Sequence, residues 1–126
     1  MDRSSERVTL LADAVVQEDS GVLLLQLVDA ANGGEGWRLP GGTLDRGEHP
    51  EAAIRRVLKM QVGLEPEYLT LAEVESTPGD HWRLLFHYRC DANRPPTIGE
   101  GVRVARFFQL EHLPQTAHGD WERDVI

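Results

Sequence analysis

The chain has 126 residues, a formal net charge of −8 and a hydrophobic content of 40%. This length suits a single domain with one core. An acidic surface disfavours binding to nucleic-acid backbones and anionic membranes, which attract clustered lysines and arginines. We therefore expect one domain over residues 1–126, less ordered at 1–7 and 115–126, with neither nucleic acid nor membrane as a partner.

The single cysteine, Cys90, excludes an internal disulfide and suits a reducing compartment. Its place within an expected strand indicates a small buried residue rather than a nucleophile. The first residues, MDRSSERV, contain no hydrophobic signal core, and the apolar runs are far shorter than a membrane span. The expected location is cytoplasmic.

The first third of the chain predicts two strands followed by loops. Residues 8–16 are rich in branched aliphatic side chains, as strands are. Residues 22–28 form a nearly continuous apolar run, which is typical of a central strand covered on both faces. Residues 30–36 contain Asn-Gly-Gly and predict a flexible loop. Residues 37–40 are expected to be extended, because the residue before a proline avoids the α region.

A helix is predicted over residues 50–62. Pro50 suits the first turn, Glu51 suits the positive end of the helix dipole, and Gly63 suits the C-terminal stop. Pro66 then prevents easy continuation of the helix.

The second half of the chain predicts three more strands. Residues 68–76 and 81–90 are expected to flank a Pro-Gly-Asp turn, and period-two alternation over 82–89 indicates a half-buried strand. A loop with two prolines at 91–101 precedes a strand over 102–110. A single helical turn is expected at 111–113.

The segment over residues 42–64 reads GTLDRGEHPEAAIRRVLKMQVGL and follows WRLPG at 37–41. It resembles the Nudix box, G-x5-E-x7-R-E-U-x-E-E-x-G-U, in which U is a bulky aliphatic residue. The lead-in is similar to the W-x-L-P-G-G of that family. The resemblance implies an α/β fold, a Nudix-type α/β/α sandwich with a small mixed β-sheet. The positions that match the box are Gly42, Glu48, Arg56, Leu58, Gly63 and Leu64.

Three positions depart from the box, because Val57, Met60 and Gln61 stand where Nudix hydrolases have glutamates. In that family these carboxylates hold the divalent metals that enable pyrophosphate cleavage. The three positions are i+3 and i+4 neighbours and project from one side of a helix. Valine and methionine offer no hard ligand to Mg²⁺, and glutamine offers one neutral oxygen. We therefore expect no cofactor, with Mg²⁺ or Mn²⁺ needed only if ligands have been relocated.

The replacements also extend an apolar line through Ala53, Val57 and Met60. Burial of Val57 and Met60 is expected to contribute roughly 1.5 to 3 kcal/mol each. The hypothesis is that the former metal cleft is closed, or converted into an apolar pocket or partner surface.

If catalysis survives, the candidate catalytic residues are Glu48, Arg56 and Glu100. The resemblance implies that Glu48 supports the loop and in some members contributes to the metal site; alternatively it only stabilises the helix dipole. Arg56 either pairs with Glu48 as a structural buttress or holds a phosphate. Glu100 is the best ligand from a late loop. Other acids considered are Asp45, Glu51, Glu73 and Glu75, of which the last two share one strand face.

The candidate ligand-binding residues lie mostly in the glycine loop. Gly41 and Gly42 allow a tight turn and close approach of the main chain to a metal or phosphate, or form an ordinary turn. Trp37 and Trp82 either stack on a nucleobase or pack in the core. Arg38 completes this set. The five histidines show no metal-site spacing, and His87 is interpreted as a packed strand residue.

Three functions are compatible with this pattern, and enzymatic activity is left open. The first is a Nudix-fold protein with a crippled metal site, which binds a nucleotide-like or other small ligand, or a partner, with little or no hydrolysis. The alternative is an active Nudix hydrolase that cleaves a nucleoside diphosphate linked to another moiety through relocated metal ligands. The third is a structural homodimer. The ligand itself is not identified by the sequence.

Overall fold

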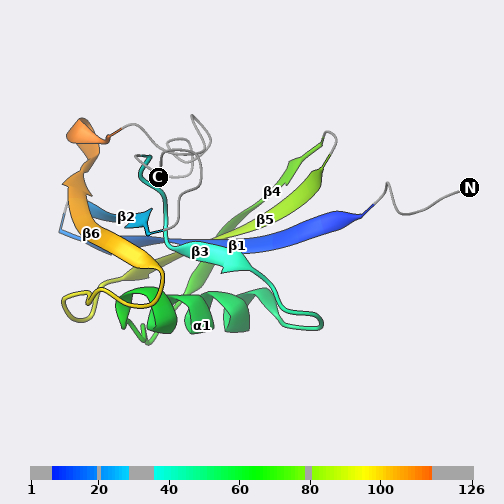
Figure 1. Cartoon of the computed structure of the whole chain (residues 1–126), viewed down its shortest axis with the longest axis horizontal. Coiled ribbons are helices and arrows are strands. Elements are labelled where there is room, and N and C mark those ends of the chain that lie inside the picture. The colour runs from blue at the N-terminus through cyan, green and yellow to red at the C-terminus, as the bar shows by residue number, and fades with distance from the viewer. Residues whose placement is uncertain (1–6, 20, 29–35, 79–80, 115–126) are drawn as a thin grey trace, which may run out of the picture.

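The computed structural model describes residues 7–19, 21–28, 36–78 and 81–114, so the expected carboxy-terminal tail and most of the 30–36 loop lie outside these ranges. Within them, six strands form one mixed sheet and the helix α1 covers one of its faces (Figure 1). The predicted mixed α/β fold is confirmed. No helix of the described ranges is both long and apolar enough to cross a membrane.

The helix and strand boundaries fall within two residues of those predicted, with one addition. Strand β3 occupies the glycine pair, where the sequence predicts only a turn. The elements are β1 (Val8–Glu18), β2 (Gly21–Leu27), β3 (Gly41–Thr43), α1 (Pro50–Val62), β4 (Thr70–Thr77), β5 (Trp82–Asp91), β6 (Val102–Gln109) and a 3-10 turn, η2 (Leu110–His112).

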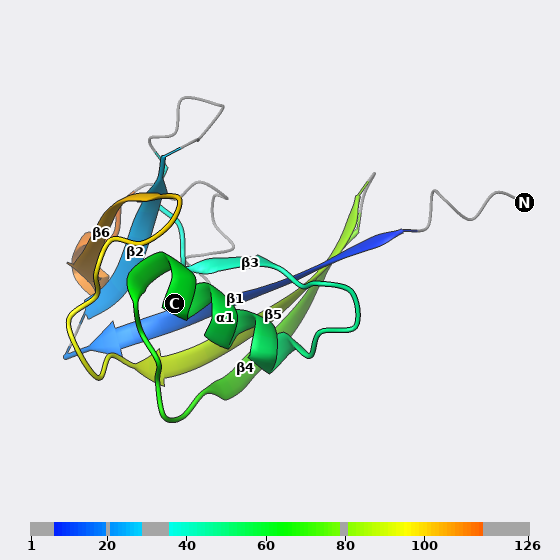
Figure 2. The same cartoon turned by 60° about the horizontal axis from the view of Figure 1, so that its bottom comes forward.

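Strand β1 is the shared strand of the sheet, whose order is β4-β5-β1-β2-β6 with β3 also on β1. One edge of β1 pairs in parallel with β5 along almost its whole length, from Val8↔Trp82 to Gln17↔Asp91. Its other edge is divided: the middle pairs with β3, and the end pairs with β2. Figure 2 shows β3 and β2 following one another along this edge. The glycine loop therefore starts from the centre of the sheet.

Alternation along β1 separates the core into two parts. Ala12, Ala14 and Val16 lie in the cluster that packs against α1, whereas Val15 packs in a second cluster on the other face. Cys90 is buried in the first cluster, as predicted, and burial raises the pKa of its thiol to about 11. At that pKa the thiol is protonated and a poor nucleophile.

The helix α1 has the predicted bounds because both of its ends are capped. The His49 ring accepts a hydrogen bond from the Glu51 amide at 3.0 Å, and Pro50 follows as the first helical residue. Gly63 ends the helix with a φ of 67°, a left-handed conformation that favours glycine.

The loop before β6 supplies donors to the last turn of α1. The amides of Thr97, Gly99 and Glu100 donate to the carbonyls of Val62, Gln61 and Met60 at 2.9, 2.8 and 3.0 Å. These carbonyls would otherwise have no partner within the helix. A Cβ on Gly99 would overlap the Met60 carbonyl oxygen and come within 2.7 Å of the Gln61 oxygen, so the approach requires glycine.

We predict that Gly99→Ala lowers the free energy of unfolding by about 2 kcal/mol or more, because the loop must withdraw from the helix end. Urea denaturation measures the change. Gly42→Ala is the matched control, since its Cβ would lie at an ordinary 3.4 Å from Val57 Cγ2. Equal unfolding midpoints for the two variants would contradict the assigned role of the loop.

Candidate functional site

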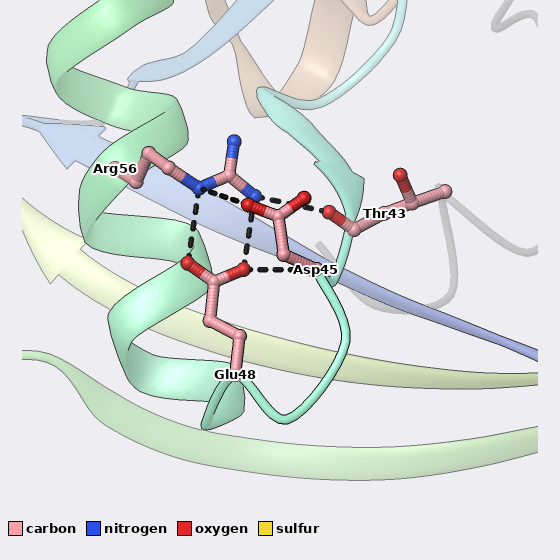
Figure 3. Close-up of polar contacts among 4 residues, drawn as sticks. All are labelled: Thr43, Asp45, Glu48 and Arg56. Carbon is pink, nitrogen blue, oxygen red and sulfur yellow. Dashed lines mark hydrogen bonds and ion pairs between the residues drawn. The ribbon is translucent and has the colours of Figure 1, made fainter.

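Arg56 and Glu48 form a two-pronged ion pair between α1 and the loop that precedes it (Figure 3). Arg56 Nε donates to Glu48 Oε2 and Arg56 Nη2 to Glu48 Oε1, both at 3.0 Å. Nη2 also donates to the Thr43 carbonyl at 3.1 Å. The forked geometry is the strong form of an arginine–carboxylate pair. The buttress pairing predicted for Arg56 is therefore present.

The backbone of Asp45 forms two further hydrogen bonds with Glu48, one to its side chain and one to its amide. The Asp45 amide donates to Glu48 Oε1 at 2.9 Å, and the Glu48 amide donates to the Asp45 carbonyl at 2.9 Å. The hydrogen bonds from Arg56 and then from the Asp45 amide hold the pKa of Glu48 below its ordinary value. Both oxygens of Glu48 are thus engaged within the protein, and its geometry is that of a loop support.

Gln61, which stands at the third glutamate position of the box, forms two hydrogen bonds with the backbone of Gly41. Its Oε1 accepts from the Gly41 amide and its Nε2 donates to the Gly41 carbonyl, both at 3.3 Å, and the residue is 8% exposed. A carboxylate can accept but cannot donate. Only the amide can pair with both backbone groups of Gly41 at neutral pH. We call this pairing the Gln61–Gly41 clamp.

Val57 and Met60 differ in their surroundings. Val57 is 2% exposed and lies against Gly42, so the burial predicted for this side chain is confirmed. Met60 is 40% exposed, and the prediction that it is buried was wrong. Its carbonyl accepts from the Glu100 amide, and its side chain is exposed to solvent. The apolar stripe therefore ends at Val57.

The two glycines of the loop have their missing side chains directed to opposite faces of the sheet. Gly41 pairs with Asp13, and a Cβ there would come within 2.7 Å of both the Asp13 Cβ and the Ala12 carbonyl oxygen. Gly42 pairs with Ala12 and faces Val57 of the helix. Close packing of β3 on β1 therefore accounts for Gly41, whereas a Cβ on Gly42 would make only an ordinary contact with Val57.

These donors do not fit a hard divalent cation at the box. Val57 provides hydrocarbon, Met60 a thioether, and Gln61 an amide already bonded twice. Glu100 is exposed at the end of α1, where its amide binds Met60. Within the described ranges, the group of three side chains spaced to hold a cation is Glu73, Glu75 and His87, which includes neither Glu48 nor Glu100.

The candidate ligand residues fall into two separate places. Trp37 packs edge-on against Phe108 of β6, with ring centroids 4.7 Å apart, and the Arg106 guanidinium lies 5.6 Å from its ring. Trp82 instead begins β5 opposite Val8 and donates to Ser76 Oγ at 2.9 Å. The structure thus does not bring the two tryptophans together.

Arg38 has an unusual environment for an arginine. Its backbone pairs with Leu25 at 2.8 and 2.9 Å, which fixes the residue beside β2. Its Nε is buried and has no hydrogen-bond partner among the described residues. A buried donor of this kind costs stability unless a bound group accepts from it.

Sequence reasoning missed the clamp and the surroundings of His87. The signal in the sequence for the clamp is that the Gln61 amide can donate as well as accept, whereas the expectation above concerns only its oxygen as a metal ligand. His87 is packed, as interpreted, but it also contacts carboxylates of two neighbouring strands. The register that brings them together has no local signal in the sequence.

Comparisons with known proteins identify the family and the fold. The family model described as NUDIX domain matches residues 9–126. An ADP-ribose pyrophosphatase of Methanocaldococcus jannaschii is 30% identical over 109 residues, which cover 83% of this chain and 64% of that protein. The chain therefore spans less than two thirds of the length of this curated relative.

Two solved structures illustrate the likeness of fold. The MutT NUDIX hydrolase from Burkholderia pseudomallei superposes with a TM-score of 0.82 at 23% identity, covering 96% of this chain and 99% of that one. The NUDIX domain of Shewanella oneidensis NrtR, crystallised with ADP ribose, gives 0.77 at 20% identity, covering 94% and 86%. Both are similar in fold at low sequence identity.

We predict that Gln61→Glu lowers the free energy of unfolding at pH 7 by about 1–3 kcal/mol, because a carboxylate faces the Gly41 carbonyl without a donor. The deficit relative to the wild type should shrink as pH falls, since the protonated carboxyl can donate again. The folded-state pKa of the new group is thus raised, and the stability it contributes is present at low pH and lost as pH rises.

Urea denaturation at several pH values measures this difference. Gln109→Glu is the control, because Gln109 is exposed at the end of β6. A Gln61→Glu midpoint equal to that of the control at pH 7 would show that the clamp contributes nothing.

Proposed function

The chain belongs to the Nudix family, whose model covers residues 9–126, and on that premise we propose that it binds a nucleotide-like small molecule with little or no hydrolysis. The observation that carries the proposal is the Gln61–Gly41 clamp. In this clamp the Gln61 amide forms hydrogen bonds with both backbone groups of Gly41. Gln61 stands at a position where family members carry a metal-holding carboxylate.

The loss of hydrolysis follows from the chemistry of the donors. Metal-assisted cleavage of a pyrophosphate requires an activated water and neutralisation of the charge on the leaving phosphate. The box offers hydrocarbon, thioether and an engaged amide for this task. Glu48 and Arg56 are retained as a mutual ion pair, which preserves the shape of the loop rather than a cation site.

Arg38 supports binding of an anionic ligand. An unsatisfied buried donor costs about 1–3 kcal/mol, and a phosphate or carboxylate oxygen that accepts from Nε would remove this cost. Trp37 precedes Arg38 and Gly41 follows it three residues later, so a ligand at Arg38 would lie near the start of the glycine loop. The ADP ribose bound to the NrtR domain makes a nucleoside diphosphate sugar the first ligand class to test.

The proposal includes a cellular compartment and an oligomeric state. Its single thiol is buried, which suits a reducing cytoplasm. We expect it to act either alone or as a homodimer, without nucleic acid.

A working hydrolase with relocated metal ligands is the competing function, and the likeness to the ADP-ribose pyrophosphatase of Methanocaldococcus jannaschii favours it. Glu48, Arg56 and Glu100 would then be the catalytic residues. Turnover of ADP-ribose that depends on Mg²⁺ or Mn²⁺ and disappears in Glu48→Gln or Glu100→Gln would select this alternative and reject the proposed function.

The decisive experiment restores the missing carboxylates. We predict that millimolar Mg²⁺ neither binds to the wild-type protein in calorimetry nor supports release of product from ADP-ribose. The triple variant Val57→Glu, Met60→Glu, Gln61→Glu should be less stable without metal, because three carboxylates repel one another, and should be stabilised by Mg²⁺. Equal metal responses of the two proteins would contradict a site lost by substitution.

Ligand binding has a separate test at Arg38. ADP-ribose should raise the melting temperature of the wild type, and Arg38→Gln should weaken binding about tenfold or more, since charge-assisted bonds to Arg38 are lost. Arg103→Gln, an exposed arginine of β6, is the control. No shift with any nucleotide, together with a concentration-dependent dimer, would favour the structural homodimer instead.

A further inference from the structure

His87 lies at the centre of a polar cluster that crosses three adjacent strands. Its side chain is completely buried. Its Nδ1 lies 2.6 Å from Asp13 Oδ1 on β1, and its Nε2 lies 3.0 Å from Glu75 Oε1 on β4. Both ring nitrogens are therefore directed at carboxylates from neighbouring strands.

This cluster occupies the face of the sheet that α1 does not cover. Phe86 and Tyr88 pack toward the helix, so His87 between them projects to the other side. Asp13 projects there as well, between Ala12 and Ala14. Glu73 and His87 are directly paired across β4 and β5, which places both on one face.

Three side chains of the cluster have the spacing of metal ligands. The donor atoms of Glu73, Glu75 and His87 all lie within 4.8 Å of one another. Ligand bonds of about 2.0–2.2 Å in a tetrahedral site place donor atoms about 3.4 Å apart, so the cluster needs only small movements to close on a cation. Exposure decreases from Glu73 through Glu75 to His87, which leaves an entry path from solvent.

Asp13 is not one of these three ligands, but it contacts the ring nitrogen of His87 that the metal would not use. Metal-binding histidines characteristically donate their second ring N–H to a carboxylate, which fixes the tautomer. With Asp13 accepting from Nδ1, the Nε2 lone pair is directed at Glu75 and repels it unless a proton or a cation lies between them. Arg83 and Arg89 also project from this face of β5, so this face carries cations as well as carboxylates, and it is the spacing of the donor atoms that suits a metal.

We propose that His87 Nε2 and the carboxylates of Glu73 and Glu75 bind a divalent first-row transition metal of the zinc class, with Asp13 as a positioning residue. One nitrogen and two carboxylate donors suit zinc, cobalt and manganese, whereas Mg²⁺ prefers oxygen alone. The metal displaces the Nε2 proton to solvent. Three protein ligands leave a coordination position for water. The site is separate from the box and stands whether or not a nucleotide binds there.

The test is titration of the chelator-treated full chain with Zn²⁺ by calorimetry and with Co²⁺ by visible absorbance. We expect one strong site, a cobalt spectrum of low coordination number, and weak or no competition from Mg²⁺. Glu73→Gln and Glu75→Gln should each weaken Zn²⁺ binding about tenfold or more, and Asp13→Asn should do so by about tenfold through the histidine. Circular dichroism confirms that each variant is folded.

Glu18→Gln is the matched control, since it removes the same charge from an exposed strand position away from the cluster. Unchanged binding in this control supports the assignment. Wild-type affinity in both Glu73→Gln and Glu75→Gln would place the zinc on other surface groups and overturn the proposal. Absence of zinc or cobalt binding by the wild type at millimolar concentration would overturn it as well, without bearing on nucleotide binding at Arg38.

Discussion

The close packing of β3 on the shared strand β1 is the contact on which the rest of the structure depends. β1 has one edge fully paired with β5, and its second edge is divided between β3 and β2. Gly41 must approach β1 without a side chain, because Ala12 and Asp13 fill the space where a Cβ would lie. The loop that follows, and the start of α1, are placed by this approach.

The same contact separates two chemically different regions. On the helix side, Val57 and the Gln61–Gly41 clamp fill the space beside the loop with an apolar group and a neutral amide. On the other side, Asp13 is available to His87 because Gly41 leaves it room. The fold beside the box is thus held by an apolar contact and a neutral amide pairing, while the carboxylates of Asp13 and Glu75 lie beside His87 on the opposite face.

Local features of the fold were accessible from the sequence, and long-range ones were not. Proline, glycine and apolar spacing predicted the bounds of α1, because these signals act over a few residues. The pairing of Arg56 with Glu48 was one of the two roles that the sequence left open for Arg56. The parallel pairing of β1 with β5 joins segments about seventy positions apart, so the Asp13–His87 contact could not be foreseen. Met60 was misassigned because helical periodicity gives a side of the helix, but not where its contact with the sheet ends.

The loop at 97–100 gives the carboxy-terminal end of α1 a partner that is distant in the sequence. Its three amides are held by helix carbonyls rather than by water, although Thr97 and Glu100 are themselves exposed. Their hydrogen exchange with solvent is then controlled by opening of the helix end rather than by local loop motion. The last turn of α1 and the loop at 97–100 therefore open together as one cooperative unit, although one is a helix and the other is a loop.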